Sequence, residues 1–201
     1  ACSDNAASDH NILQLKLFEE ITFSINDKNI KVHFLSSGGL FNYNDYCYNF
    51  IRLGLSIYGV SPLKKINHNL KPVMELKAPI VLIKNILKGE KVGYGCTFIA
   101  KSDMNIAIIQ LGYADGLSKN FENNGTVFFN NKKYPIIGKI SMDLFAINCN
   151  NKTFNINDEV TIWGGNHQES RLEYISNNHN LIPYVYLTNL SNRVKRIYVE
   201  K

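Results

Sequence analysis

Two glycine-containing turns form the first pattern in this sequence that could do chemistry. Residues 36–39 read Ser-Ser-Gly-Gly, and residues 52–55 read Arg-Leu-Gly-Leu. Glycines let neighbouring backbone N–H groups converge on an anion, and the start of a helix adds a favourable potential. In a (β/α)8 barrel, phosphate sites are commonly built from the turns after the last two strands. The pair of turns therefore indicates a phosphate site, although residues 36–39 alone also fit an ordinary glycine turn capped by serine.

Arg52 is the second informative residue, because it is one of only four arginines and lies among apolar neighbours. A guanidinium group keeps its charge and is costly to bury without a partner. A carboxylate such as that of Asp45 is one partner that would satisfy it, and a bound ligand is another. The residues by themselves leave both alternatives open.

The spacing of the four cysteines does not indicate metal or redox chemistry. Cys2, Cys47, Cys96 and Cys149 form no CxxC pair and have no histidine at ligand spacing. The spacing therefore predicts neither a zinc site nor a disulfide motif. Reduced thiols are typical of a cytoplasmic protein, so we expect that location.

The composition is that of a folded chain. The 201 residues are 45% apolar and 19% charged, with a formal net charge of +5 that comes mostly from scattered lysines. This pattern favours a solvated basic surface over a nucleic-acid-binding stripe. The longest apolar run is far shorter than the roughly 20 residues that a membrane helix needs. The first residues show neither an initiator methionine nor an export signal, from which we expect a fragment or a processed product.

The helices and strands that must position these residues follow two different sequence patterns, one in each part of the chain. Residues 1–62 alternate a helical pattern (12–21), a strand (30–34), the Gly-rich turn with a short helix, and a second strand (50–54), as in a parallel α/β fold. Residues from 63 onward show short apolar runs between turns, and only residues 170–179 are expected to be helical. The expected strands contain residues 80–87, 106–111, 126–129, 144–147, 160–163 and 197–199. The interruption by Ser61-Pro62 and Lys64-Lys65 predicts a boundary near residues 60–70.

Several phrases in order along the chain resemble the alanine racemase family, pyridoxal-phosphate enzymes that interconvert L- and D-alanine. These phrases are RLGLSIYG at 52–59, LKPVM at 70–74, GEKVGYG at 89–95, GYADG at 112–116, GKISMD at 138–143 and RVKRIY at 193–198. The resemblance runs nearly from end to end. It implies an α/β plus all-β fold, in which residues 1–62 are the C-terminal part of a cofactor-binding (β/α)8 barrel. Residues 63–201 would then form a barrel-like C-terminal β domain.

The resemblance also assigns roles to the cofactor-binding residues. Ser37, with backbone groups of Gly54 and Leu55, would hold the cofactor phosphate. Arg52 would face the pyridine nitrogen, to which a guanidinium can donate a hydrogen bond without giving up a proton. No metal ion is implied.

At the substrate end, the resemblance implies that Tyr94 is one of two groups that move the Cα proton, one on each face of the substrate. The other group is the family's cofactor lysine, which lies upstream and has no counterpart in this chain. Tyr113 would narrow the entrance, and the Met142 backbone N–H would meet the substrate carboxylate. Without the family, Tyr113 could equally be a strand-end aromatic and Met142 a core residue.

The implied biology is the supply of D-alanine for bacterial peptidoglycan by a cytoplasmic homodimer whose subunits share active sites. Because the cofactor lysine is missing, we expect little or no activity from the chain alone. The alternative is a non-catalytic module that binds a partner chain or complements a separate N-terminal half. Departures from the family pattern are Ser36, Val185, Asn192 and Lys195.

Overall fold

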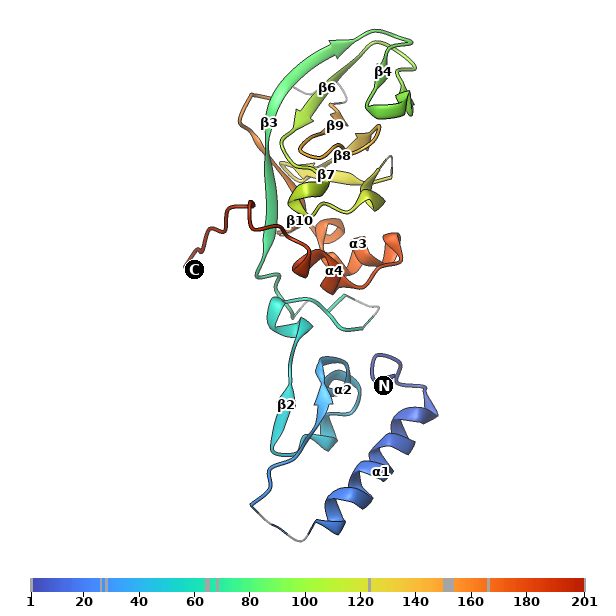
Figure 1. The fold of residues 1–201 in the computed structure, drawn as a ribbon, viewed down its shortest axis with the longest axis vertical. Coiled ribbons are helices and arrows are strands. Elements are labelled where there is room, and N and C mark those ends of the chain that lie inside the picture. Colours follow the sequence, from blue (N-terminus) through green and yellow to red (C-terminus); the bar gives the residue numbers. More distant parts are fainter. Residues whose placement is uncertain are drawn as a thin grey trace. The chain divides into compact units, whose positions relative to one another are not determined.

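The chain forms two compact units, residues 1–71 and 72–201. The computed structural model describes residues 2–25, 27, 29–63, 66–67, 69–122, 124–149, 154–165 and 167–200 (Figure 1). Lys64 and Lys65, which the sequence places at the boundary, lie outside the described residues. Within the described part of the chain, no helix is both long enough and apolar enough to cross a membrane.

The first unit alternates helices and parallel strands. Its elements are α1 (Asp9–Ser24), β1 (His33–Ser36), α2 (Ser37–Asn42), the 3-10 turn η1 (Asn44–Tyr46), β2 (Phe50–Arg52) and the 3-10 turn η2 (Leu55–Tyr58). Strands β1 and β2 are parallel, with Ser36 opposite Arg52. This βαβ order is a segment of a (β/α)8 barrel, as the sequence predicts. The first strand begins three residues later than the expected position 30, since its pairing with β2 starts at His33.

Helix α1 packs through one face only. Leu15 is buried, and the ring of Phe18 lies 4.8 Å from that of Phe34 on β1. On the opposite face, Leu13 and Leu17 are 60% and 58% exposed. Apolar residues on both faces of a helix are typical of one that packs on two sides.

The second unit is built around a closed barrel of six strands in the order β10-β3-β6-β9-β8-β7. These strands are β3 (Glu75–Ile86), β6 (Met104–Ile109), β7 (Thr126–Phe129), β8 (Lys132–Ile137), β9 (Phe145–Asn148) and β10 (Glu159–Gly164). Each of these strands contributes buried side chains, and Ile80, Val127 and Ile147 are fully buried. Buried Cys149 directly follows β9, and burial raises the pKa of its thiol to about 11.

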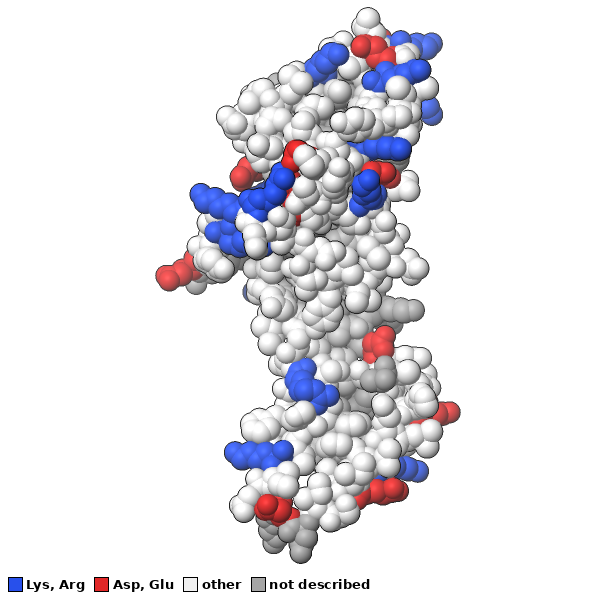
Figure 2. All heavy atoms as spheres, viewed as in Figure 1, with Lys and Arg blue, Asp and Glu red and all other residues white. Residues whose placement is uncertain are grey.

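Shorter elements surround this barrel. The hairpin of β4 (Lys91–Val92) and β5 (Phe98–Ile99) encloses the turn η3 (Tyr94–Cys96). The remaining elements are the turns η4 (Tyr113–Asp115), η5 (Lys119–Phe121) and η6 (Gln168–Ser170) and the helices α3 (Leu172–His179) and α4 (Pro183–Thr188). Figure 2 shows lysines and arginines in separate small groups on each unit, interspersed with acidic residues, which agrees with a solvated basic surface.

Three expectations about the second unit are wrong in detail. Residues 170–179 are not its only helix, because α4 follows as a short helix with Pro183 at its first position. Residues 197–199 form no strand: these side chains are more than 70% exposed and have no strand partner among the described residues. Strand β8 was not expected, because its charged start and Pro135 hide the strand pattern.

Candidate functional site

The two glycine turns of the first unit meet in space. Ser37 is the first residue of α2, is buried, and its Oγ accepts a hydrogen bond from the Gly54 backbone N–H at 3.0 Å. Gly54 precedes η2, so the starts of two helical turns lie side by side. The arrangement brings together Ser37, Gly54 and Leu55 as the sequence expects. A hydroxyl and two sets of helix-start N–H groups are donors that suit a phosphate.

Arg52 lies beside this turn, on the strand opposite Ser36, and is exposed. Its Nη1 bonds to His33 Nδ1, and its Nη2 donates to the Phe34 carbonyl oxygen at 3.0 Å. The ion pair with Asp45 that the sequence allowed is therefore wrong, since a neighbouring strand supplies the partners instead.

His33 is a site residue that the sequence analysis missed. It stands at the start of a strand with no motif around it, and only the parallel pairing of β1 with β2 places it against Arg52. Because Arg52 is always a donor, His33 Nδ1 must accept, and the ring proton must sit on Nε2. The imidazole thus orients the guanidinium as a fixed donor.

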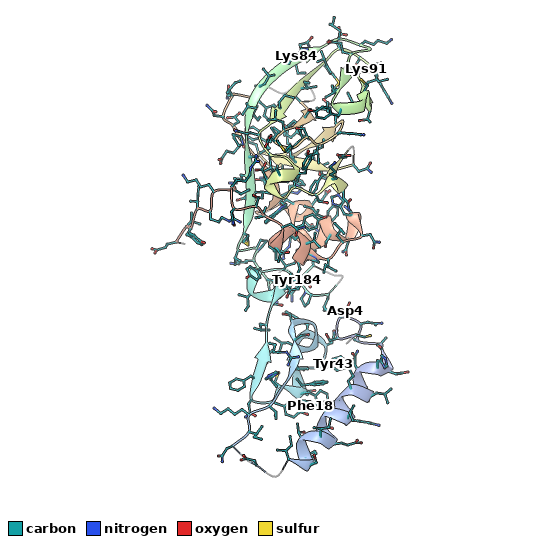
Figure 3. The ribbon with its side chains drawn as sticks, viewed as in Figure 1. Asp4, Phe18, Tyr43, Lys84, Lys91 and Tyr184 are labelled. Atoms are coloured by element: carbon teal, nitrogen blue, oxygen red, sulfur yellow. The ribbon has the colours of Figure 1, made fainter. Side chains whose placement is uncertain are left out.

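A cavity of about 350 Å³ opens next to this pair, between α1 and β1. Phe18 from α1 and Tyr43 from the end of α2, both labelled in Figure 3, line it. His33, Ser36 and Arg52 line it as well. The first unit therefore combines a phosphate-type turn, a fixed guanidinium and an adjoining hollow.

Tyr94 is displayed at the tip of the β4–β5 hairpin. Its side chain is 73% exposed, and its phenol makes no hydrogen bond with the described residues. Gly93 and Gly95 on either side have φ of 78° and 70°. These left-handed values favour glycine and force the tight turn that projects the phenol outward.

Tyr113 and Met142 form a second group in the same unit. The Tyr113 and Ala114 backbone N–H groups donate to the carbonyls of Ser141 and Met142 at 3.1 and 3.0 Å. Met142 is 51% exposed, which contradicts the alternative of a core methionine. Tyr113 begins a 3-10 turn, and Lys119 Nζ lies 4.8 Å from the centre of its ring.

Among the described residues, no three His, Cys, Asp or Glu side chains are grouped so as to hold a metal ion. All four cysteines are free. The chemistry available therefore rests on hydroxyl, guanidinium, phenol and backbone groups.

The fold and these groups define a class of protein in which an α/β-barrel segment with a glycine-containing turn is followed by a closed β barrel with exposed tyrosines in its unit. The chain belongs to the alanine racemase family: the sequence model of the alanine racemase C-terminal domain matches residues 73–198, and that of the N-terminal domain matches residues 1–62.

Curated relatives support the family assignment. The chain is 37% identical over 194 residues to the alanine racemase of Vesicomyosocius okutanii, covering 96% of this chain and 54% of that protein. It is 39% identical over 203 residues to that of Rickettsia bellii, covering 98% of this chain and 48% of that protein. The chain thus spans about half the length of these relatives.

Solved structures also support the family assignment. The Bartonella henselae alanine racemase, whose structure contains covalently bound pyridoxal phosphate, superposes with a TM-score of 0.90 at 36% identity and covers 99% of this chain and 55% of its own. The Streptomyces lavendulae alanine racemase gives a TM-score of 0.92 at 27% identity, with 100% and 55% covered.

Proposed function

We propose that this chain supplies the phosphate turn and the substrate-facing β domain of an alanine racemase that depends on pyridoxal phosphate. The observation that carries the proposal is the bond between Ser37 Oγ and the Gly54 N–H beside an oriented Arg52. These are the three components that the family uses at the two ends of the cofactor. Alanine, a cytoplasmic location and D-alanine synthesis for bacterial peptidoglycan are parts of the same proposal.

The residues present fit that cofactor. Ser37 and the N–H groups of Gly54 and Leu55 suit its phosphate, and Arg52 suits its ring nitrogen. The buried Ser56 Oγ, directly after Leu55, has no hydrogen-bond partner among the described residues. It is a spare polar atom next to the phosphate donors. When bound, the cofactor supplies the electron-withdrawing group that makes the Cα proton of an amino acid removable.

The chain's own residues then bind the cofactor ring, move the proton and position the substrate. Arg52 keeps its proton and holds the ring nitrogen as a neutral acceptor. The Tyr94 phenol removes or delivers the Cα proton on one face, and the Met142 N–H and Tyr113 position the carboxylate and limit the entrance. The other face needs a second proton-transfer group, which in the family is the cofactor lysine.

We further propose that two subunits share each site, with the β domain of one subunit presenting Tyr94 to the cofactor turn of the other. The 73% exposure of Tyr94 supports this arrangement, since a phenol that acts on a partner's substrate must stand free of its own unit. Activity would then require association.

The test is to assay the chain alone and mixed with an N-terminal polypeptide that carries the cofactor lysine. We expect bound-cofactor absorbance and D-alanine production in the mixture only. In the mixture, Tyr94→Phe should remove racemisation while one enantiomer of alanine still exchanges its Cα proton with deuterated water. This result is expected because one of the two faces keeps its proton-transfer group. Tyr184→Phe, at an exposed tyrosine on α4, is the matched control and should stay active.

A non-catalytic role in binding a partner chain is the second candidate. The observation that favours it is the exposed stripe of Leu13, Leu17 and Ile21 on α1. A stable complex with the N-terminal polypeptide, but no cofactor absorbance and no racemisation, would support this role and overturn the first.

A further inference from the structure

We propose that Arg193 is a positioning residue that fixes the spacing of the two loops carrying Tyr113 and Met142. The inference rests on the proposed function, because it concerns the substrate end of the same site. The sequence analysis used Arg193 only as part of the C-terminal phrase RVKRIY.

The side chain of Arg193 bridges two carboxylates from different loops. Its Nε lies 2.8 Å from Asp115 Oδ1, and its Nη2 donates to Asp143 Oδ1. Asp115 closes the turn that begins with Tyr113, and Asp143 directly follows Met142. One guanidinium thus ties together the two residues that face the substrate.

Asp115 links Arg193 to the backbone of its own loop. Its other oxygen, Oδ2, accepts the Gly112 backbone N–H at 2.8 Å, and the residue is only 8% exposed. The carboxylate therefore holds the start of the Tyr113 turn with one oxygen and Arg193 with the other. A buried carboxylate with both oxygens engaged has little freedom to move.

Backbone hydrogen bonds hold the two loops together at Ser141 and Met142. Tyr113 and Ala114 donate to Ser141 and Met142, as described above. Beyond Met142, only the Arg193 bond joins Asp143 to the Tyr113 turn among the described residues. Loss of that bond should loosen the side of Met142 where a substrate carboxylate would bind.

The C-terminal segment is rigid enough to act as the anchor. The Ser191 N–H donates to the Asp115 carbonyl at 3.0 Å. Arg196 donates to the carbonyls of Leu190, Ser191 and Val194, at 3.0, 2.6 and 2.6 Å. These bonds fix the turn from which Arg193 projects.

Arginine is required here because its donors point in two directions. The Nε and Nη2 groups reach separate carboxylates at once, whereas the single ammonium of a lysine reaches one or sits between them. Hydrogen bonding to Asp143, followed by the charges of Asp115 and Asp143, raises the pKa of the Arg193 guanidinium. The bridge therefore persists at every pH at which the carboxylates are ionised.

Amide hydrogen exchange on the chain as it exists tests the positioning role directly. Arg193→Gln should speed exchange of the Tyr113 and Ala114 amides about five- to tenfold, because local opening becomes easier. The amides between β6 and β9 should not change. Lys195→Gln removes the same charge from an exposed neighbour and should change none of these rates. Unchanged rates in Arg193→Gln, or a uniform rise that includes β6 and β9, would overturn the proposal.

A kinetic measurement in the complemented enzyme separates positioning from stability. Arg193→Gln should raise the KM for alanine several-fold with a smaller change in kcat, and Arg193→Lys should restore part of the loss. An unchanged KM would count against a role at the substrate end. If the wild-type mixture has no racemase activity, the proposed function fails, while the exchange experiment still decides whether Arg193 holds the two loops.

Discussion

At the scale of single residues, the pair of His179 and Tyr186 joins α3 to α4. His179 Nδ1 lies 2.7 Å from Tyr186 Oη, and Phe121 packs edge-on against both rings. Burial lowers the pKa of His179 and raises the pKa of Tyr186 to about 12. Both groups are therefore held in their neutral forms by the folded state.

This pair predicts a stability maximum between neutral and mildly alkaline pH. Below about pH 6.5 the unfolded chain binds a proton that folded His179 resists, so stability falls as the pH drops. Above about pH 10 the unfolded chain releases a proton that folded Tyr186 keeps, so stability falls as the pH rises toward 12. Urea unfolding midpoints across this range provide the measurement. The buried Cys149 thiol, with its pKa of about 11, adds to the same alkaline limb. Tyr186→Phe should therefore make this limb shallower, whereas Tyr184→Phe, at an exposed tyrosine of the same helix, should leave it intact.

The residues that the sequence could identify are those inside short, distinctive phrases. Tyr94 stands between two glycines, Tyr113 follows a glycine and Met142 precedes an aspartate, and those neighbours reflect local turns that the sequence encodes. His33 and the bridge of Arg193 could not be found in this way. The first depends on parallel strand pairing, and the second joins residues fifty positions apart along the chain.

At the scale of elements, the close approach of the η4 turn to the loop around Met142 depends on Gly112. A Cβ added at Gly112 would lie 2.1 Å from the Met142 carbonyl oxygen and 2.4 Å from the Asp143 nitrogen. Both atoms belong to the backbone and cannot rotate away. The two loops can therefore meet only if residue 112 has no side chain.

Gly112→Ala should destabilise the second unit by about 1–3 kcal/mol, because the clash forces the loops apart. Gly89→Ala is the control, since a Cβ there meets nothing within 4 Å and only the φ of 91° opposes it. That substitution should cost about 1–2 kcal/mol, from the backbone conformation alone. Chemical unfolding measures both. An effect of Gly112→Ala smaller than that of Gly89→Ala would show that the two loops can separate at little cost.

The elements were predictable where short apolar runs lie between turn residues, as in β3, β6, β7, β9 and β10, or where apolar residues recur at helical spacing, as in α1. The failures have physical causes. In β8, lysines face solvent and Pro135 breaks the pattern, while α4 is too short to show a helical period. Residues 197–199 have strand-like composition but no strand beside them in the described chain, which shows that composition alone does not make a strand.

At the scale of the whole molecule, the two units differ in how completely they bury their backbone. The second unit closes β3 and β6 to β10 into a barrel, and this barrel has no free strand edge; only the small β4–β5 hairpin lies outside it among the described strands of the unit. The first unit has a sheet of only two strands, and its helix α1 exposes Leu13, Leu17 and Phe23. The first unit should therefore be the less stable of the two.

Hydrogen exchange should show this difference in the isolated chain. Amides of α1 and β1 are expected to exchange much faster than those of β6 and β9, because few buried contacts oppose local opening in the first unit. Addition of the N-terminal polypeptide should slow the first group and leave the second unchanged. Strong protection of α1 in the isolated chain would contradict the expectation.

The labelling rate of the Cys149 thiol can measure how long the β barrel stays closed. This thiol sits fully inside the second unit, with a pKa of about 11, while Cys47 and Cys96 lie at the surface. A reagent that attacks thiolates meets the two surface cysteines at once but must wait for the barrel to open before it reaches Cys149. The slow phase of labelling therefore reports the lifetime of the closed barrel, in a protein that needs no introduced probe.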